Sequence, residues 1–448
     1  MTDIALGRPA RLKTSLLDQS PRTRNRNFAE KRFELYGMAA VAFGLLALVV
    51  LLTTILGNGL SSFRQTFVTL QIELPQAKLD KSGTGDLEAI KKVSTFGYAP
   101  LIDTALEQTM AQLGITIDGL SAKQAAGIIS KEAPAKLRDA VIANPALIGT
   151  VHEFRLLANG RIDGYYKGAV TMDSATRDAN VSPELLILAD ALKAAGLLAT
   201  SLNPGFITDS DASDQRPEAA GLGVAILGSL YMMMIVLVLA LPIGVAASIY
   251  LEEFAPKNRW TDVIEVNISN LAAVPSIVFG ILGLAIFINF AGLPQSAPIV
   301  GGLVLTLMTL PTIIIATRAS LKSVPPSIRD AALGVGASKM QAVLHHVLPL
   351  AAPGILTGTI IGLAQALGET APLLLIGMVA FVKEFPGAPP EGFFDPASAL
   401  PVQIFNWTQR ADPAFVERAS GAIIVLLVFL IAMNTVAVLL RRRFERRW

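Results

Sequence analysis

Residues 327–349 read SIRDAALGVGASKMQAVLHHVLP, a polar and small-residue island between two long hydrophobic stretches. Ser327 with Asp330 has the spacing of a capping box, which predicts the start of one short helix. Gly334 and Gly336 are of the residue type that most often ends a helix. The first half of the island is therefore predicted to be ordered.

A second short helix is predicted by Ser338 with Gln341, which again have the spacing of a capping box. Two capped helices in a loop between hydrophobic stretches favour a docking surface over a flexible tether. We therefore expect a partner protein to exert force on this island, and we expect that force to move the rest of the chain.

The composition is that of a membrane protein. The 448 residues are 52% hydrophobic and 16% charged, with a mean hydropathy of +0.54, whereas a soluble domain carries about 25% charged residues. Six stretches meet the requirement of about 20 apolar residues for a helix that crosses the hydrocarbon core: 36–57, 222–251, 266–289, 299–320, 351–382 and 420–440. The sequence thus predicts an α-helical polytopic membrane protein with about six transmembrane helices.

The distribution of charge predicts how the chain is threaded through the membrane. Tail 1–35 carries eight Lys and Arg against four acids and tail 441–448 five Arg against one Glu, whereas segment 58–220 carries fifteen Lys and Arg against nineteen acids. Positive residues favour the cytoplasmic side. We expect a multi-pass protein of the bacterial inner membrane with both termini and the island in the cytoplasm and 58–220 in the periplasm.

The ends of the chain suggest no function beyond the membrane. The Arg clusters adjoin spans that face membrane lipid, so we expect no nucleic-acid partner. Tail 1–35 is expected to lack regular structure before Phe33. No A-x-A cleavage site follows the stretch 36–57, which is therefore predicted to be a permanent transmembrane anchor.

Segment 58–220 is predicted to form an α+β extracytoplasmic domain inserted after the first helix. Residues 67–74 have the β-branched and aromatic content of a strand, and Asn159-Gly160 is typical of a hairpin turn. Residues 205–220 are rich in Gly, Asp, Ser and Pro and are interpreted as a linker. The domain shows no catalytic constellation, the chain has no Cys, and no metal site is expected.

The fourth hydrophobic stretch carries polar side chains at helical spacing. Thr306, Thr309 and Thr312 are predicted to share one face of a helix. Their hydroxyls either bond back to carbonyls of their own helix or line a polar path for a substrate. Arg318 and Lys322 follow at the cytoplasmic end and are expected to reach for the membrane interface.

The fifth stretch carries glycines one helical turn apart. Gly354, Gly358 and Gly362 recur every four residues, a spacing that lets two membrane helices approach closely. We predict that these glycines form a helix-packing seam.

A carboxylate lies deep in the same stretch. Glu369 follows Gln365 by one turn, and a charge at this depth costs at least a few kcal/mol unless it faces water or a partner. Thr370 and Pro372 follow, and the helix is predicted to break in the segment GETAPLL, 368–374. Either these polar groups belong to a translocation path or gate, or Glu369 makes a purely structural hydrogen bond.

Several motifs are absent from the chain. It contains no Gly-Lys dipeptide and so lacks the phosphate-cradling loop G-x-x-x-x-G-K-[ST]. It also lacks G-x-S-x-G and H-E-x-x-H. We expect no enzyme and no cofactor bound by this chain itself.

The island resembles the cytoplasmic loop of the permease subunits of bacterial ABC importers. That loop has the pattern Glu-Ala-Ala, three residues, Gly, nine residues, Ile, one residue, Leu-Pro. Here Asp330 replaces Glu and His346 replaces Ile, and the other positions match. The resemblance implies the type I ABC importer permease fold and gives the ATPase-coupling role to Ser327, Asp330, Ala331, Ala332, Gly336, Leu348 and Pro349.

The spans resemble one branch of this family, the A-type permease of phosphate importers. The segments concerned are ALPIGVAASIYLEEFAP (240–256), LAAVPSIVFGILGLAIF (271–287) and GILTGTIIGLAQALGETAPLL (354–374). The resemblance implies that 221–440 is the permease domain. It also implies a second, C-type permease subunit, a homodimeric ATPase that binds ATP and Mg, and a periplasmic phosphate-binding protein.

Two other functions stay open at this point. One is a permease for another oxyanion, such as sulfate or molybdate. The other is a membrane-anchored sensor with 58–220 as its receiver. The role of the segment before the permease domain is not given by the resemblance.

Overall fold

The structure is a computed structural model that describes residues 21–80 and 87–444. The chain divides into two compact units, 1–55 and 56–448. The described part of the first unit is helix α1 (Pro21–Gly59), which runs on into the second unit. The expectation of no regular structure before Phe33 is wrong for residues 21–32, because a long apolar helix, once formed, adds residues at little cost. Residues 1–20 of that tail lie outside the described residues.

Long apolar helices dominate the second unit. Within the described residues, five helices including α1 are long and apolar enough to cross a membrane, or six if a bent pair counts as one span. After α1 they are α11 (Gly223–Ile249), α14 (Pro298–Lys322), α17 (Leu348–Gly368) and α20 (Ala414–Phe444), and the bent pair is α12 (Arg259–Ala272) and α13 (Ser276–Gly283). The predicted polytopic helical fold is confirmed.

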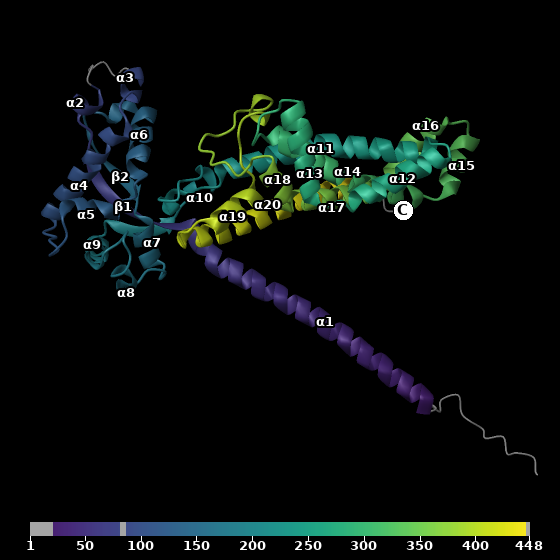
Figure 1. The fold of residues 1–448 in the computed structure, drawn as a ribbon, viewed down its shortest axis with the longest axis horizontal. Helices are drawn as coiled ribbons and strands as arrows, with labels where there is room; N and C mark the ends of the chain where they lie inside the picture. Colours follow the sequence, from purple (N-terminus) through teal and green to yellow (C-terminus); the bar gives the residue numbers. More distant parts are fainter. Residues whose placement is uncertain (1–20, 81–86, 445–448) are drawn as a thin grey trace, which may run out of the picture. The chain divides into compact units, whose positions relative to one another are not determined.

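Helix α14 lies between α11 and α17, and this trio forms the middle of the membrane part (Figure 1). Its core is made of buried aliphatic side chains from all three helices, such as Val236, Val304 and Leu363. Gly301 and Gly302 lie against Met232 and Ile235, so α14 comes close to α11 where it carries no side chain. Small residues of this kind are what lets apolar helices pack tightly without a hydrophobic driving force.

The helices of the membrane part are broken at two places, and the break predicted in 368–374 is one of them. The pair α12 and α13 bends by 101° just before Ser276, where Pro275 cannot donate a backbone hydrogen bond. Helix α17 ends at Gly368, and the short helix α18 (Ala371–Leu375) follows. Within the fifth predicted stretch, 351–382, the helical residues therefore end at Leu375, and the helix is interrupted after Gly368.

The segment after α1 folds as the predicted α+β domain, called here the extension domain (64–202). Its sheet has the order β2-β1-β3, with β1 (Arg64–Glu73) antiparallel to both β2 (Val151–Leu157) and β3 (Leu198–Leu202). The first strand is central because its alternate side chains, among them Val68 and Leu70, are buried. Its main helices are α4 (Ala99–Gln112), α6 (Ala133–Ala143) and α9 (Pro183–Ala194).

The shorter helices complete the description. In the extension domain and the segment after it they are α2 (Gln76–Leu79), α3 (Leu87–Lys91), α5 (Ala122–Ala125), α7 (Gly160–Tyr166), α8 (Met172–Ala175) and α10 (Gly205–Thr208). In the membrane part they are α15 (Pro326–Gly334), α16 (Lys339–Ala342) and α19 (Leu400–Gln409).

Two sequence predictions for the extension domain and the segment after it are wrong. Asn159-Gly160 is not a hairpin turn: the Asn159 side chain accepts a hydrogen bond from Arg161 N and caps α7, a role that asparagine fills readily. Residues 205–220 are not a loose linker either. Phe206 and Glu218 are buried there, and the segment packs against α19 and α20.

Candidate functional site

The island 327–349 folds as two short helices at one end of the helical bundle, opposite α10 and α19 (Figure 1). The predicted cap of α16 is present: Ser338 Oγ accepts a hydrogen bond from Gln341 N at 3.3 Å, and Ser338 N donates to Gln341 Oε1 at 2.9 Å. Gly336 has φ +90°, a conformation that costs any residue with a Cβ. The turn between the helices thus needs a glycine at this position.

The predicted capping box at Ser327 is wrong. Helix α15 begins one residue earlier, at Pro326, and Pro325 is its N-cap without a side-chain hydrogen bond. A proline at the first helical position is already set for the helix. Ser327 lies in the first turn, so its hydroxyl is not at the capping position.

The island presents an exposed surface with apolar side chains on it. Val335 is 87% exposed, and Leu333 and Met340 are about half exposed. Of the residues predicted to couple to an ATPase, Ala332 is buried and Leu348 half-buried, and the others are exposed: Ser327, Asp330, Ala331, Gly336 and Pro349. Exposed apolar side chains grouped in one loop are typical of a protein-binding surface.

Arg329 ties the island to the helices beneath it. Its guanidinium donates to Glu253 Oε1 at 2.8 and 3.0 Å and to the carbonyl oxygens of Leu321 and Val324, each at 2.8 Å. Glu253 lies in the turn that ends α11, and its side chain is only 8% exposed. Arg329 therefore links α15 directly to the ends of α11 and α14. Sequence reasoning missed this pair, because its partners are 76 residues apart.

A second ion-pair group lies next to it. Arg318 Nη2 is 2.6 Å from Glu265 Oε1, and Arg318 Nε is 3.4 Å from Glu252 Oε2. Lys322 Nζ is 3.5 Å from the same Glu252 oxygen. Both cations were expected to reach for the interface. Their ion pairs join the ends of α11 and α14 to the middle of α12, and the adjacent acids Glu252 and Glu253 were the available signal in the sequence.

The threonines of α14 differ in their surroundings. Thr306 Oγ1 donates to Gly302 O at 2.7 Å and Thr309 Oγ1 to Leu305 O at 2.9 Å, and both side chains are buried. Thr312 is half-buried. The hydroxyls of Thr306 and Thr309 thus bond back to their own helix, which is the first of the two alternatives, and the geometry favours a path role only for Thr312.

The glycines of α17 face α14. A Cβ on Gly354 would meet Ser320, and one on Gly358 would overlap the Cβ of Ala316. A Cβ on Gly362 would lie 3.5 Å from Ile313, an ordinary contact. The glycines therefore occupy a contact between two helices, and it is tightest at Gly354 and Gly358.

The polar residues around the break in α17 are only partly covered. Gln365 is exposed, and Glu369 and Thr370 are half-buried. Within the described residues, no hydrogen bond or ion pair joins the Glu369 carboxylate to another group. The break thus places an unpaired acid beside backbone groups that have left the helix, while Gln365 lies one turn earlier on an uncovered face.

Charged residues also meet where the extension domain joins the last span. Arg418 of α20 is 3% exposed, and it donates to Gln65 Oε1 and to the carbonyl oxygens of Glu218 (2.9 Å) and Ser62 (3.3 Å). The Glu218 carboxylate accepts from Ser130 Oγ at 2.5 Å. Burial raises the pKa of Glu218 above its ordinary value, although Ser130 and Arg418 oppose the shift.

A second bridge runs beside the first. Lys167 Nζ is 2.6 Å from Asp163 Oδ2 and 2.8 Å from Glu417 Oε1, and the Lys167 side chain is 9% exposed. Asp163 in turn accepts from the backbone and hydroxyl of Thr66 on β1. Chain segments far apart in sequence thus form one buried charged junction, which sequence reasoning did not find.

The described residues offer no metal centre: they contain no group of three or more His, Cys, Asp or Glu side chains placed to hold an ion. The geometry suits coupling of motion between chain segments, with ion pairs at both ends of the bundle and a broken helix between them.

Comparison with known proteins gives two family matches. The family described as binding-protein-dependent transport system inner membrane component matches residues 240–448. A domain of unknown function, DUF3333, matches residues 20–176.

Curated relatives match the membrane part. The probable ABC transporter permease protein YqgI of Bacillus subtilis is 33% identical over 230 residues, covering 49% of this chain and 78% of that protein. The phosphate transport system permease protein PstA 1 of Mycobacterium tuberculosis is 31% identical over 230 residues, covering 51% and 73%. The PstA protein of Xylella fastidiosa is 30% identical over 228 residues, covering 50% and 77%. Among solved structures, the inward-facing MetNI methionine ABC transporter is 15% identical with a TM-score of 0.40, covering 50% of this chain and 97% of that one.

Proposed function

The chain belongs to the family of binding-protein-dependent transport system inner membrane components, and from that premise we propose that it is the A-type permease of an ATP-driven phosphate importer. It is a multi-pass inner-membrane permease subunit of the ABC importer class. The choice of phosphate is supported by relatives named as phosphate transport permeases, which align over about half of this chain.

The observation that carries the proposal is the island of α15 and α16. It is an exposed surface with uncovered apolar side chains, held by Arg329 to the ends of α11 and α14. In the proposed mechanism, an ATPase binds ATP and Mg, closes, and moves the island. The Arg329–Glu253 contact passes this motion to the spans, which open outward and later return after hydrolysis.

The proposed importer has three further components. A second permease subunit of the C type would cover apolar faces that this chain leaves exposed, such as that of α13. A homodimeric ATPase would dock at the island, with both termini of this chain on the same cytoplasmic side. A periplasmic phosphate-binding protein would deliver the anion to the outer side, where 58–220 lies.

The path for the anion is proposed from the groups that are free to meet it. Phosphate needs hydroxyls, amides or helix N-termini to replace its water. Thr312, Gln365 and Thr370 offer such groups, because their side chains make no hydrogen bond within the part of the chain that the structure describes. Glu369 would repel an anion, and we assign it to gating.

The docking claim is tested at Gly336. We expect Gly336→Asp to abolish phosphate uptake and to prevent the ATPase from co-purifying, because it strains the turn and adds a charge to the surface. Gly119→Asp is the matched control, since Gly119 in the extension domain also has positive φ and open space around it. Loss of uptake with the ATPase still bound would refute docking at this turn.

Selectivity is tested by competition. In cells or proteoliposomes with the complete transporter, unlabelled phosphate should suppress uptake of radiolabelled phosphate, and equal concentrations of sulfate or molybdate should leave it unchanged. Suppression by either of these anions, with little by phosphate, would assign the permease to another oxyanion.

Gating is tested at Glu369. The Glu369→Gln variant keeps the size of the side chain and removes its negative charge. We expect slowed phosphate uptake with the ATPase still bound and the variant present in the membrane at the normal level. Uptake at the normal rate would contradict a gating role.

A further inference from the structure

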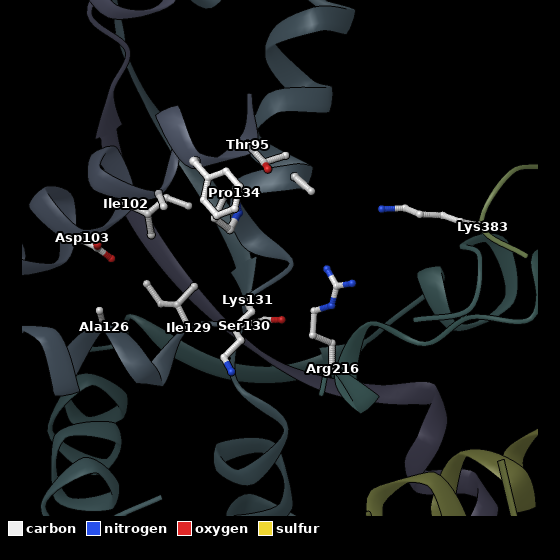
Figure 2. Close-up of a pocket in the computed structure, with 13 residues that line it drawn as sticks. Thr95, Ile102, Asp103, Ala126, Ile129, Ser130, Lys131, Pro134, Arg216 and Lys383 are labelled. Atoms are coloured by element: carbon white, nitrogen blue, oxygen red, sulfur yellow. The ribbon is translucent and has the colours of Figure 1, made fainter. Parts of the chain in front are cut away.

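A cavity of about 460 Å³ lies on the outer side of the chain, where the extension domain meets the outer loop of the membrane part (Figure 2). Its walls come from segments 95–103 and 126–135 of the domain, from Arg216 in the segment after it, and from Lys383 in the loop between α18 and α19. Small-molecule sites usually have volumes of about 300–1,000 Å³. The cavity is therefore large enough for a ligand of modest size.

The cavity has a cationic side. Figure 2 shows Arg216 and Lys383 on one side of the opening, and Lys131 also belongs to the lining. Arg216 pairs with Glu132, and Lys383 Nζ is 3.7 Å from the same carboxylate. One acid is thus shared by two cations, so one positive charge is left for a ligand.

The opposite side is apolar and carries one acid. Ile102 and Ile129 form part of the floor with Pro134, and the ring of Phe96 beside them is 86% exposed. Asp103 is the acid in the lining, and its pKa is raised first by burial and then by the nearby Glu107. Cations on one side and apolar groups on the other fit an organic anion with an apolar body.

The two walls are fastened to different parts of the permease. The domain wall is held to α20, because Arg418 donates to Gln65 Oε1 and Lys167 pairs with Glu417. The loop wall is held to α11, because Tyr231 Oη donates to Gly387 O at 3.0 Å and Leu400 N donates to Ser229 Oγ at 2.9 Å. A ligand between the walls would therefore link the outer ends of α20 and α11.

We propose that this cavity is a regulatory site for a small organic anion, held at its charged end by Arg216 and Lys383 and at its apolar end by the floor of Ile102, Ile129 and Pro134. Binding clamps the extension domain against the outer loop and so hinders relative movement of α20 and α11. This site goes beyond the proposed transport of phosphate and does not depend on which anion is transported.

The binding test uses the full chain in lipid nanodiscs and the fluorinated probe 4-(trifluoromethyl)benzoate, followed by its fluorine NMR signal. The neutral amide of the probe is the matched ligand control, because it keeps the apolar body and loses the charge. We expect the acid to bind and the amide to bind at least about tenfold more weakly, as the loss of one charge-assisted hydrogen bond predicts. Equal binding of the two would overturn an anion site.

Two variants locate the site. Lys383→Ala removes the more exposed cation, and we expect it to raise the dissociation constant of the acid about tenfold. Lys123→Ala is the matched control, since Lys123 is an exposed lysine of the same domain outside the cavity. Unchanged binding by Lys383→Ala, or equal loss in both variants, would overturn the assignment.

The regulatory part of the proposal has its own readout. In proteoliposomes containing the assembled transporter, probe added on the outer side should lower the uptake rate of wild type, and Lys383→Ala should need about tenfold more probe for the same effect. Binding without any change in uptake would leave the site but overturn the clamp. Inactive wild-type proteoliposomes would speak against the transport function and leave the binding result intact.

Discussion

Glu218 is the buried carboxyl with the clearest consequence for stability. It lies outside the spans, is 4% exposed, and burial raises its pKa. A group whose pKa is raised by folding stabilises the native state fully below its ordinary pKa, about 4.3 for glutamate, and loses that contribution as pH rises through the raised value. The junction is thus predicted to weaken on going from acid to neutral pH.

The variant Glu218→Gln tests this sign. Glutamine keeps an oxygen that accepts from Ser130 but does not ionise. The difference in melting temperature, variant minus wild type, should therefore rise as pH rises through the raised pKa and then stay constant. The measurement is thermal unfolding of the purified chain across this pH range. Glu73→Gln, at an exposed glutamate of β1, should show no such trend, and parallel curves for Glu218→Gln and wild type would contradict the prediction.

Arg418 allows a second prediction at the residue scale. Arg418→Met keeps an apolar stem of similar length but leaves the oxygens of Ser62, Gln65 and Glu218 without their donor. Breaking a buried charged network in this way costs about 3–5 kcal/mol, so the free energy of unfolding should fall by about that amount. Denaturant unfolding measures it. Arg442→Met, an exposed arginine at the other end of α20, is the control, and an equal small loss in both would show that the junction contributes little.

Sequence predicts single residues well when their partners are close along the chain. Ser338 caps α16 as expected from its spacing to Gln341. Ser327 fails because the two prolines before it move the helix start, which is itself a local effect that the pattern overlooked. Arg418 has its side-chain partner more than three hundred residues away, and no local pattern indicates it.

At the scale of elements, the contact between α14 and α17 makes a sharp prediction. Gly358→Ala places a methyl group against Ala316, and overpacking of this kind costs about 1–3 kcal/mol. We expect a lower unfolding free energy and slower uptake, because the two helices must separate. Gly368→Ala is the matched control in the same helix, since nothing lies within 4 Å of a Cβ there. Equal stability of the two variants would contradict the seam.

Two element boundaries follow from a proline or glycine that stands at the break. The bend before Ser276 follows Pro275, and α17 ends just before Glu369, as the segment GETAPLL predicted. Asn159-Gly160 was not predictable in the same way, because asparagine suits both a hairpin turn and a helix cap. The pairing of β2 decides between these two roles: β2 pairs with β1 and not with the residues that follow it.

At the scale of the whole molecule, hydropathy indicates five or six spans within the described residues, but it says nothing about how the extension domain is attached. Residues 205–220 have the composition of a linker and yet pack against α19 and α20: Phe206 stacks on Trp407, and Asp211 accepts from Trp407 Nε1 at 2.9 Å and from Arg410 at 2.6 Å. Composition measures the average polarity of a segment, whereas this attachment depends on a few side chains with distant partners.

The last prediction separates the domain from its attachment. Phe63 O accepts from Asn203 N at 2.9 Å, so the extension domain, 64–202, is replaceable by a short Gly linker without stretching the chain. This variant keeps Phe206 and Asp211 under α19, but α20 loses the contact of Arg418 with Gln65 and that of Glu417 with Lys167. We expect it to insert in the membrane and import phosphate, with an unfolding free energy lower by about 3–5 kcal/mol and no response to the probe at the cavity.

The matched variant removes 58–220 entirely. It uncovers Trp407 and Phe415, both fully buried in the aromatic cluster with Phe206, and burying each large side chain stabilises by about 1.5–3 kcal/mol. It also leaves Arg410 without Asp211. We therefore expect this chain to be degraded or to aggregate, as followed by its level in the membrane and by size-exclusion chromatography. If both deletions gave equally stable permeases, the segment 205–220 would be a linker after all, because only then would its packing be dispensable to the membrane part.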